Sequence, residues 1–229
     1  MSKIVKSRLK NLSLLQLTIF ILILLLVTPA FALALNEFID GNLYENILFS
    51  IEFTFYGLPP FFALLLCLIQ FPESMERIRL TKKLEFKVNL CCIASAAFTS
   101  AFVPIFALII LAIYHQTTQI FILGLMIEVY IRYLMMFVTI GLIQYLGTLW
   151  LKNKWYMAGF LMISFSCLAF LYYIRTDFGN LFKMAFFYLT PPVAESGHSL
   201  VAIIPVFVGS SGLLSVLCYF RLVTQEHLS

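Results

Sequence analysis

Six long apolar stretches follow one another along the chain, and they constrain its fold more than any other feature. An α-helix needs roughly 20 apolar residues to cross the hydrocarbon core of a bilayer. The stretches cover about residues 14–35, 47–70, 88–114, 120–150, 156–174 and 200–220. Hydrophobic residues make up 62% of the 229 residues, against about half in a soluble domain. The sequence therefore predicts an all-α polytopic membrane protein, a single transmembrane domain over residues 1–229 with six transmembrane helices.

The basic residues predict which side of the membrane each connection faces. Residues 1–13 form a basic amphipathic segment with no acid, and the connections 71–87 and 151–155 are also rich in Lys and Arg. The connection 36–46 carries acids and no base. Basic connections face the cytoplasm, so we expect a multi-pass protein of the cell membrane with both termini cytoplasmic. The net charge of +4 belongs to these connections, and we expect the lipid bilayer, and no nucleic acid, as a partner.

The first span has a competing interpretation. Its basic start, its apolar core and the segment PAFALA (residues 29–34) resemble a secretory signal with an A-x-A-type cleavage site. The apolar run is long for such a signal, and five further spans follow it. We therefore expect an uncleaved first span.

Residues 175–199 differ from the spans on either side. Their apolar run, residues 184–189, is too short to cross a bilayer, and Pro191 and Pro192 end it. Their charges are nearly balanced, which is compatible with the outer side. We expect a re-entrant outer segment before the last span.

The connection between the second and third spans, FPESMERIRLTKKLEFK (residues 71–87), is unusually charged for a chain with only 11% charged residues. Its acids lie near its start and its lysines near its end, in the order that matches a helix dipole. The charged residues are Glu73, Glu76, Arg77, Arg79, Lys82, Lys83, Glu85 and Lys87. Pro72 suits a first-turn position. The pattern favours a short cytoplasmic helix over the alternative, a solvated loop that only anchors topology.

Residues 76–81, ERIRLT, and the layout of the spans resemble ABC-2-type transporter permeases. In that family the connection between spans two and three often reads E-R-x-x-G-T and forms the coupling helix that meets an ATPase subunit. Glu76, Arg77 and Thr81 fit this pattern, and Leu80 stands where the family usually has Gly. The resemblance covers nearly the whole chain in layout and a few residues in motif. The coupling residues that it implies are Glu73, Glu76, Arg77, Arg79 and Thr81.

The resemblance also implies partners. No phosphate-binding pattern G-x-x-x-x-G-K-[ST] occurs in the sequence, so ATP and Mg²⁺ would be bound by a separate ABC ATPase subunit and this chain would bind no cofactor. A second permease copy, or a related permease, would complete a dimer. The expected function is export of a hydrophobic or antimicrobial peptide or a drug-like amphiphile. The alternatives are an ATP-independent secondary transporter and a toxin-immunity membrane protein.

The fourth span contains MIEVYIRYLMM, which places Glu128 and Arg132 four residues apart on one helical face. Charges inside a membrane are costly and need a partner or a watery cavity. We expect an intramembrane polar pair that neutralises itself inside the bundle. The functional alternative is a polar patch on a substrate path or at a subunit interface.

Catalysis by this chain is not expected. Glu128 and Arg132 form E-x-x-x-R but lack the double Glu of intramembrane proteases of the E-E-x-x-x-R type, and the three His residues fall in predicted outer loops and the tail. No H-E-x-x-H motif or serine-hydrolase elbow occurs. The five Cys residues lie in or beside apolar spans, without metal-site spacing. The sequence predicts no catalytic residue and no metal site.

Overall fold

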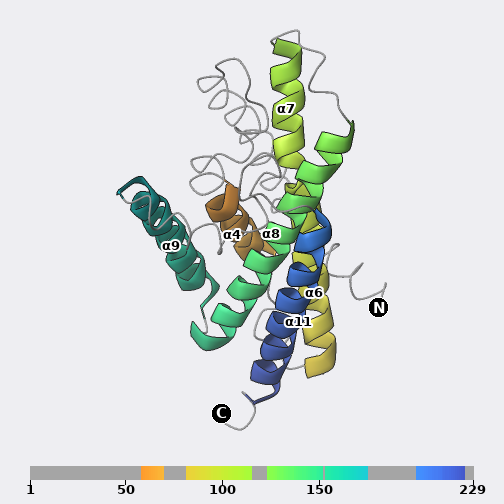
Figure 1. The fold of residues 1–229 in the computed structure, drawn as a ribbon. Helices are drawn as coiled ribbons and strands as arrows, with labels where there is room; N and C mark the ends of the chain where they lie inside the picture. The colour runs from red at the N-terminus through yellow and green to blue at the C-terminus, as the bar shows by residue number, and fades with distance from the viewer. Residues whose placement is uncertain (1–57, 70–80, 115–122, 152, 175–199, 225–229) are drawn as a thin grey trace.

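The structure is a computed structural model that describes residues 58–69, 81–114, 123–151, 153–174 and 200–224. All regular structure in these ranges is helical (Figure 1). The helices are α4 (Leu58–Ile69), α6 (Lys82–Ser100), α7 (Phe102–Tyr114), α8 (Leu123–Leu151), α9 (Lys154–Ile174) and α11 (Leu200–Thr224). An all-helical fold is therefore confirmed for the described part of the chain.

Three runs within the described residues are long and apolar enough to cross a membrane: Lys82–Ala107, Met126–Leu151 and Leu200–Thr224. They correspond to the predicted third, fourth and sixth spans, so the chain is a membrane protein. α4 lies within the predicted second span, and α9 covers the predicted fifth span (156–174) and begins two residues before it. The predicted first span (14–35) and the predicted re-entrant segment (175–199) lie outside the described residues.

Helix α8 lies at the centre of the bundle, where it packs against each of the other five described helices. It is apolar on all sides, which is typical of a helix surrounded by other helices. Of its residues whose burial is described, only Ile127, Ile143, Trp150 and Leu151 are exposed. α8 is therefore a packing partner shared by all the other described helices, while α4 and α9 also pack extensively against each other.

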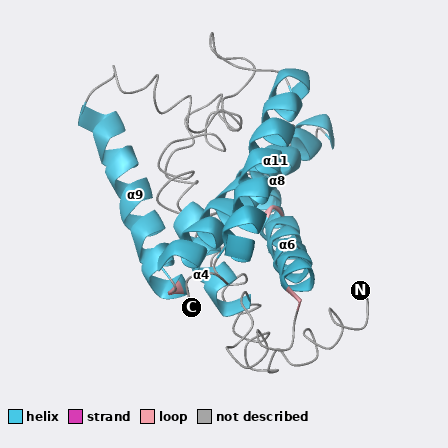
Figure 2. Cartoon of the chain, turned by 90° about the horizontal axis from the view of Figure 1, so that it is seen from below, coloured by secondary structure: helices cyan, strands magenta, loops and turns pink. Residues whose placement is uncertain are grey.

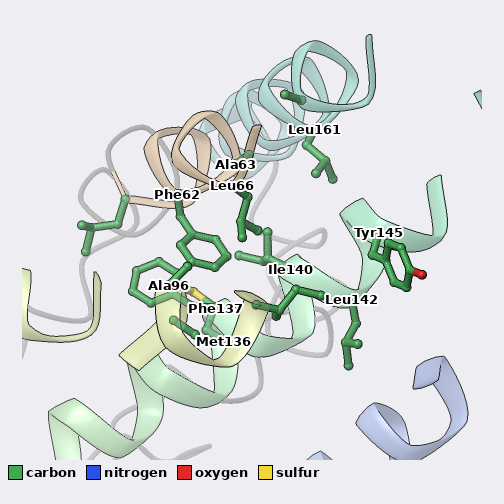
Figure 3. Packing of buried hydrophobic residues seen from close by; sticks show 14 of the residues in the cluster. Phe62, Ala63, Leu66, Ala96, Met136, Phe137, Ile140, Leu142, Tyr145 and Leu161 are labelled. Atoms are coloured by element: carbon green, nitrogen blue, oxygen red, sulfur yellow. The ribbon is translucent and has the colours of Figure 1, made fainter. Parts of the chain in front are cut away.

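The largest part of the apolar core lies where α4, α6, α8 and α9 meet (Figure 3). Phe62 of α4 packs on Phe137 of α8 with their ring centroids 4.6 Å apart. Figure 3 shows Ala96 of α6 beside the same pair of rings, and Leu161 pointing from α9. The view from below in Figure 2 shows α9 set apart from α6 and α11, with α4 between α9 and the other helices.

The described helices run in the directions that consecutive spans require. α6 is antiparallel to α8, because Phe98 packs on Tyr130 while Phe86 packs near Tyr145. α11 is parallel to α8, because Ile203, near the start of α11, packs on Met135 in the middle of α8, and Arg221 lies over Trp150 near the ends of both helices. These are the directions predicted for spans three, four and six.

The third predicted span is two helices rather than one. α6 ends at Ser100, Ala101 forms a turn, and α7 begins at Phe102. Pro104 explains the break, because it has no N–H to donate to the carbonyl of Ser100 and its ring would clash with that carbonyl in a continuous helix. Proline is tolerated in the first turn of α7, where its missing N–H does no harm.

The start of α6 corrects one expectation about the charged connection. The lysines were expected at the C-terminal end of a separate helix, but Lys82 and Lys83 lie in the first turn of α6, where the dipole disfavours cations. Thr81 before them is extended, and its carbonyl accepts hydrogen bonds from the N–H groups of Leu84 and Glu85 at 2.8 and 2.9 Å. The chain therefore enters the apolar helix directly, and the dipole argument is wrong for these lysines.

Nearly all the described cations lie at one end of the bundle. This end contains the start of α6, the end of α8, the start of α9 and the end of α11. The cations are Lys82, Lys83, Lys87, Lys154 and Arg221. Both Trp residues of the chain, Trp150 and Trp155, lie there too, and the guanidinium of Arg221 is 4.4 Å from the ring centroid of Trp150. Trp and cationic residues at one depth are typical of a membrane–water interface.

A glycine on α8 permits close contact with α6. A Cβ added at Gly141 would lie 2.6 Å from Cγ2 of Ile93 and 3.3 Å from Cδ1 of Leu66. Because Ile93 is β-branched and strongly prefers one χ1 rotamer in a helix, its Cγ2 can move away only by an unfavourable rotation of χ1 or by a movement of α6. Gly141→Ala should therefore destabilise the protein by about 1–3 kcal/mol through overpacking, measured by thermal unfolding in detergent micelles.

Gly209→Ala is the matched control for this substitution. Gly209 also lies inside a helix, so both changes carry the same gain in helix propensity, but a Cβ there would meet nothing within 4 Å. Equal unfolding temperatures for the two variants would contradict the close packing of α6 on α8.

Candidate functional site: polar residues inside the bundle

The structure brings Glu128 and Arg132 of α8 together. Nε and Nη2 of Arg132 donate to Oε1 of Glu128 at 2.9 and 2.6 Å. The arginine side chain is fully buried, whereas the glutamate side chain is 25% exposed. A buried guanidinium pays several kcal/mol of desolvation unless a carboxylate and good geometry offset it. The carboxylate of Glu128 therefore offsets the cost of burying the Arg132 charge.

The two members of this pair differ in what they offer to another molecule. Arg132 is enclosed, so its donors are not accessible from outside the bundle. Glu128 remains partly exposed, and an ionised carboxylate is only an acceptor. The accessible side of the pair therefore suits a cationic or hydrogen-bond-donating group better than an anion.

A second polar contact inside the bundle joins α8 to α4 and α9. Nε2 of Gln144 donates to the carbonyl of Ala63 at 2.8 Å and to Sγ of Cys67 at 3.3 Å. The Cys67 thiol in turn donates to the carbonyl of Lys154 at 3.3 Å. Gln144 is fully buried. Hydrogen bonds between helices hold membrane bundles together because hydrocarbon offers no other partner.

Sequence reasoning did not identify this junction. Gln144 is a lone amide within the apolar run of the fourth span, and such an amide needs a partner inside the bundle. That signal was available in the sequence. The identity of the partners was not, because Ala63 and Cys67 are about 80 positions away and one of them acts through its backbone.

Three polar residues of α6 are also buried: Glu85, Asn89 and Ser100. Glu85 and Asn89 are four residues apart and therefore share a helical face, and their exposed fractions are 1% and 0%. The sequence analysis placed Glu85 in the charged connection 71–87, expected to form a short cytoplasmic helix. The structure places it inside the cationic end of the bundle, in the first turn of α6, where a carboxylate is favoured by the helix dipole.

Of the five predicted coupling residues, only Thr81 is described. Thr81 is exposed at the cationic end of the bundle, immediately before α6, and its side chain makes no capping hydrogen bond. The others, Glu73, Glu76, Arg77 and Arg79, lie outside the described residues. They precede Thr81 by two to eight positions.

Within the described ranges, no group of three His, Cys, Asp or Glu side chains could hold a metal ion. All five cysteines are free, and Cys67 and Cys218 are buried as expected for small apolar side chains. Comparison of the chain with known protein families, characterised proteins and solved structures gave no match.

The buried ion pair leads to a prediction about stability. Glu128→Leu removes the carboxylate from a fully buried arginine, so we expect a loss of about 3–5 kcal/mol. Glu128→Leu combined with Arg132→Met replaces both charges by apolar groups and should recover most of that loss. Unfolding in detergent micelles measures both variants, with Ile127→Leu on the adjacent exposed position as control. If Glu128→Leu alone is as stable as the wild type, the ion pair does not contribute to stability.

The Gln144 junction leads to a separate prediction. Gln144→Met keeps the length of the side chain but removes both hydrogen bonds to α4, so we expect a loss of about 0.6–1.7 kcal/mol. Thr139→Val on the same helix is the control, because the Thr139 hydroxyl bonds only the carbonyl of Met135 within α8. The free energies of unfolding of Gln144→Met and Thr139→Val are measured by chemical denaturation in micelles and compared. A larger loss in the control would contradict a role for Gln144 in joining helices.

Proposed function

We propose that this chain is the membrane-spanning permease subunit of an ATP-binding cassette exporter, powered by a separate ATPase subunit that binds ATP and Mg²⁺. The observation that carries the proposal is the stretch ERIRLT and its continuation into α6. The part of the stretch that resembles a coupling helix ends at Thr81, and α6 begins at the next residue.

This continuity supplies a route for mechanical coupling. The hydrogen bonds from Leu84 and Glu85 to the Thr81 carbonyl tie the connection to the first turn of α6. α6 packs against α8, α4 and α11, and Ile93 fits against Gly141 with no room for a Cβ. Close-packed interiors transmit displacement rather than absorb it. A shift of the connection by an ATPase subunit therefore moves α6 against the central helix and biases the bundle between two arrangements.

The charge distribution supports the side on which the ATPase subunit binds. The cations and both Trp residues lie at the end of the bundle from which Thr81 leads into α6. By the positive-inside rule this end is cytoplasmic, which is where an ATPase finds ATP. In this proposal the chain has six spans in the cell membrane with both termini cytoplasmic.

The proposed cargo is an amphiphile such as a hydrophobic or antimicrobial peptide or a drug-like molecule, carried by a dimer of this chain or of this chain with a related permease. The described helices are apolar and rich in aromatic residues, which suits the apolar part of such a cargo. Glu128, the accessible member of the ion pair, suits a cationic group on it.

A second candidate is an ATP-independent secondary transporter, which the break between α6 and α7 favours, because such carriers bind substrates and ions at discontinuous helices. The groups around this break fit that role poorly. The carbonyl of Phe98, in the last turn of α6, already accepts a hydrogen bond from the hydroxyl of Tyr130 at 3.2 Å. Its aromatic neighbours, Phe102 and Tyr130, stack with ring centroids 4.8 Å apart. The exporter is therefore the better supported function.

The proposal is tested by changing Glu76 and Arg77, the two residues before α6 that fit the first two positions of the E-R-x-x-G-T pattern. In the variant Glu76→Ala with Arg77→Ala, we expect ATP-dependent export to fall at least about tenfold, equivalent to about 1.4 kcal/mol of coupling, while insertion into the membrane is unchanged. Export, ATP hydrolysis and co-purification of the ATPase subunit are the measurements. Lys83→Ala, at an exposed position in the first turn of α6, is the control and should keep all three.

Two results would contradict the proposal. One is unchanged association, hydrolysis and export in the double variant, which would remove the coupling assignment. The other is a mild-detergent purification of the tagged chain from its own host that recovers no ATPase subunit.

A further inference from the structure

The outer halves of α6 and α8, together with α7, enclose a groove that the preceding sections leave unassigned. It has a volume of about 260 Å³. Its lining residues are Phe98, Phe102, Ile105, Met126, Ile127 and Tyr130. It lies beside the break at Ala101 and opens to the outside of the bundle, because Phe98 and Ile127 are 53% and 49% exposed.

The lining of the groove is apolar and offers no hydrogen bond. Every atom that it exposes is apolar, although Tyr130 belongs to it, because the Tyr130 hydroxyl donates to the carbonyl of Phe98. Phe98 meets both Phe102 and Tyr130 edge-on, with ring centroids 5.5 and 5.7 Å apart. The walls are therefore held in place by their own contacts, and an occupant is recognised by apolar contact alone.

The depth of the groove in the membrane follows from helix geometry. Tyr130 precedes Trp150 by twenty residues, or about 30 Å along α8 at 1.5 Å per residue. Phe102 follows Lys87 by fifteen residues, or about 22 Å along α6 and the start of α7. The hydrocarbon core is about 30 Å thick. Because Trp150 and Lys87 lie at the cationic end, the groove lies in the opposite half of the bilayer.

The size of the groove suits a hydrocarbon chain. Its volume of about 260 Å³ exceeds that of the cavity of about 150 Å³ that admits benzene in another protein. A slender hydrocarbon chain therefore fits in the groove.

From its depth, its lining and its size, we propose that this groove is a binding site for one acyl chain of a bilayer phospholipid from the half of the membrane opposite the cationic end. The acyl chain packs against the aromatic walls and fills the angle between α7 and α8 at the break. The proposal depends on the membrane-spanning helices and not on the proposed export function.

The test uses the full chain in lipid nanodiscs of phosphatidylcholine that carries a photoactivatable diazirine near the middle of one acyl chain. After illumination, mass spectrometry maps the labelled residues. We expect the six lining residues to be labelled at least about fivefold more than Ile163 and Leu213. These two lie on α9 and α11 and are 66% and 65% exposed, so they report contact with bulk lipid.

A substitution that fills the groove provides the second arm. Ile127→Trp should reduce labelling of the other lining residues at least about fivefold, whereas Ile143→Trp should leave it unchanged. Ile143 is the matched control because it lies on the same helix and is 39% exposed, outside the groove. If Ile127→Trp aggregates on size-exclusion chromatography, Ile127→Phe, a smaller filling, should still reduce the labelling.

Three outcomes would overturn the proposal. Labelling in proportion to exposure over all apolar surfaces would show contact with bulk bilayer only. Labelling that neither filling variant changes would place the acyl chain elsewhere. Loss of groove labelling when a stoichiometric amphiphilic peptide is added would assign the groove to cargo instead of lipid.

Discussion

The hydrocarbon interior of a bilayer offers no hydrogen-bonding partner, so the protein itself must satisfy each polar group of its spanning helices. This constraint explains the principal polar contacts of the bundle. Where Pro104 breaks the third span, the Tyr130 hydroxyl bonds a carbonyl in the last turn of α6. Where the amide of Gln144 enters the core, it bonds the backbone of α4 and the thiol of Cys67. The buried guanidinium of Arg132 is paired with the carboxylate of Glu128.

These contacts converge on α8, which supplies the Tyr130 hydroxyl, the Gln144 amide and both members of the Glu128–Arg132 pair. α8 can occupy the centre because it is apolar on every side and because Gly141 allows α6 to approach closely. A tightly packed central helix also means that the surrounding helices move against a common partner. This property makes coupling through α6 physically reasonable, since the charged connection that leads into α6 is the only coupling element that the sequence resemblance identifies.

Charge divides the bundle into two chemically different ends. The cationic end, with both Trp residues, is suited to a membrane surface, and in the proposed function it meets the ATPase subunit. The opposite half contains the aromatic groove and the Glu128–Arg132 pair, which suit acyl chains and amphiphiles. The proposed coupling surface and the proposed lipid site are therefore about one bilayer apart, and a change at one can be measured while the other is left intact.

The sequence by itself determined the helical class, the positions of the described helices within their apolar runs and the i, i+4 pairing of Glu128 with Arg132, because apolar length and helical spacing are local properties. It also contained Pro104, although the break that this residue causes was not predicted. Only the tertiary structure decided that α8 is central, that Glu85 is buried, that Gln144 reaches Ala63 and that six apolar side chains form a groove. The physical reason is that each of these depends on which helices lie side by side. In a chain that is apolar almost throughout, the hydrophobic pattern does not distinguish a face that meets another helix from one that meets lipid.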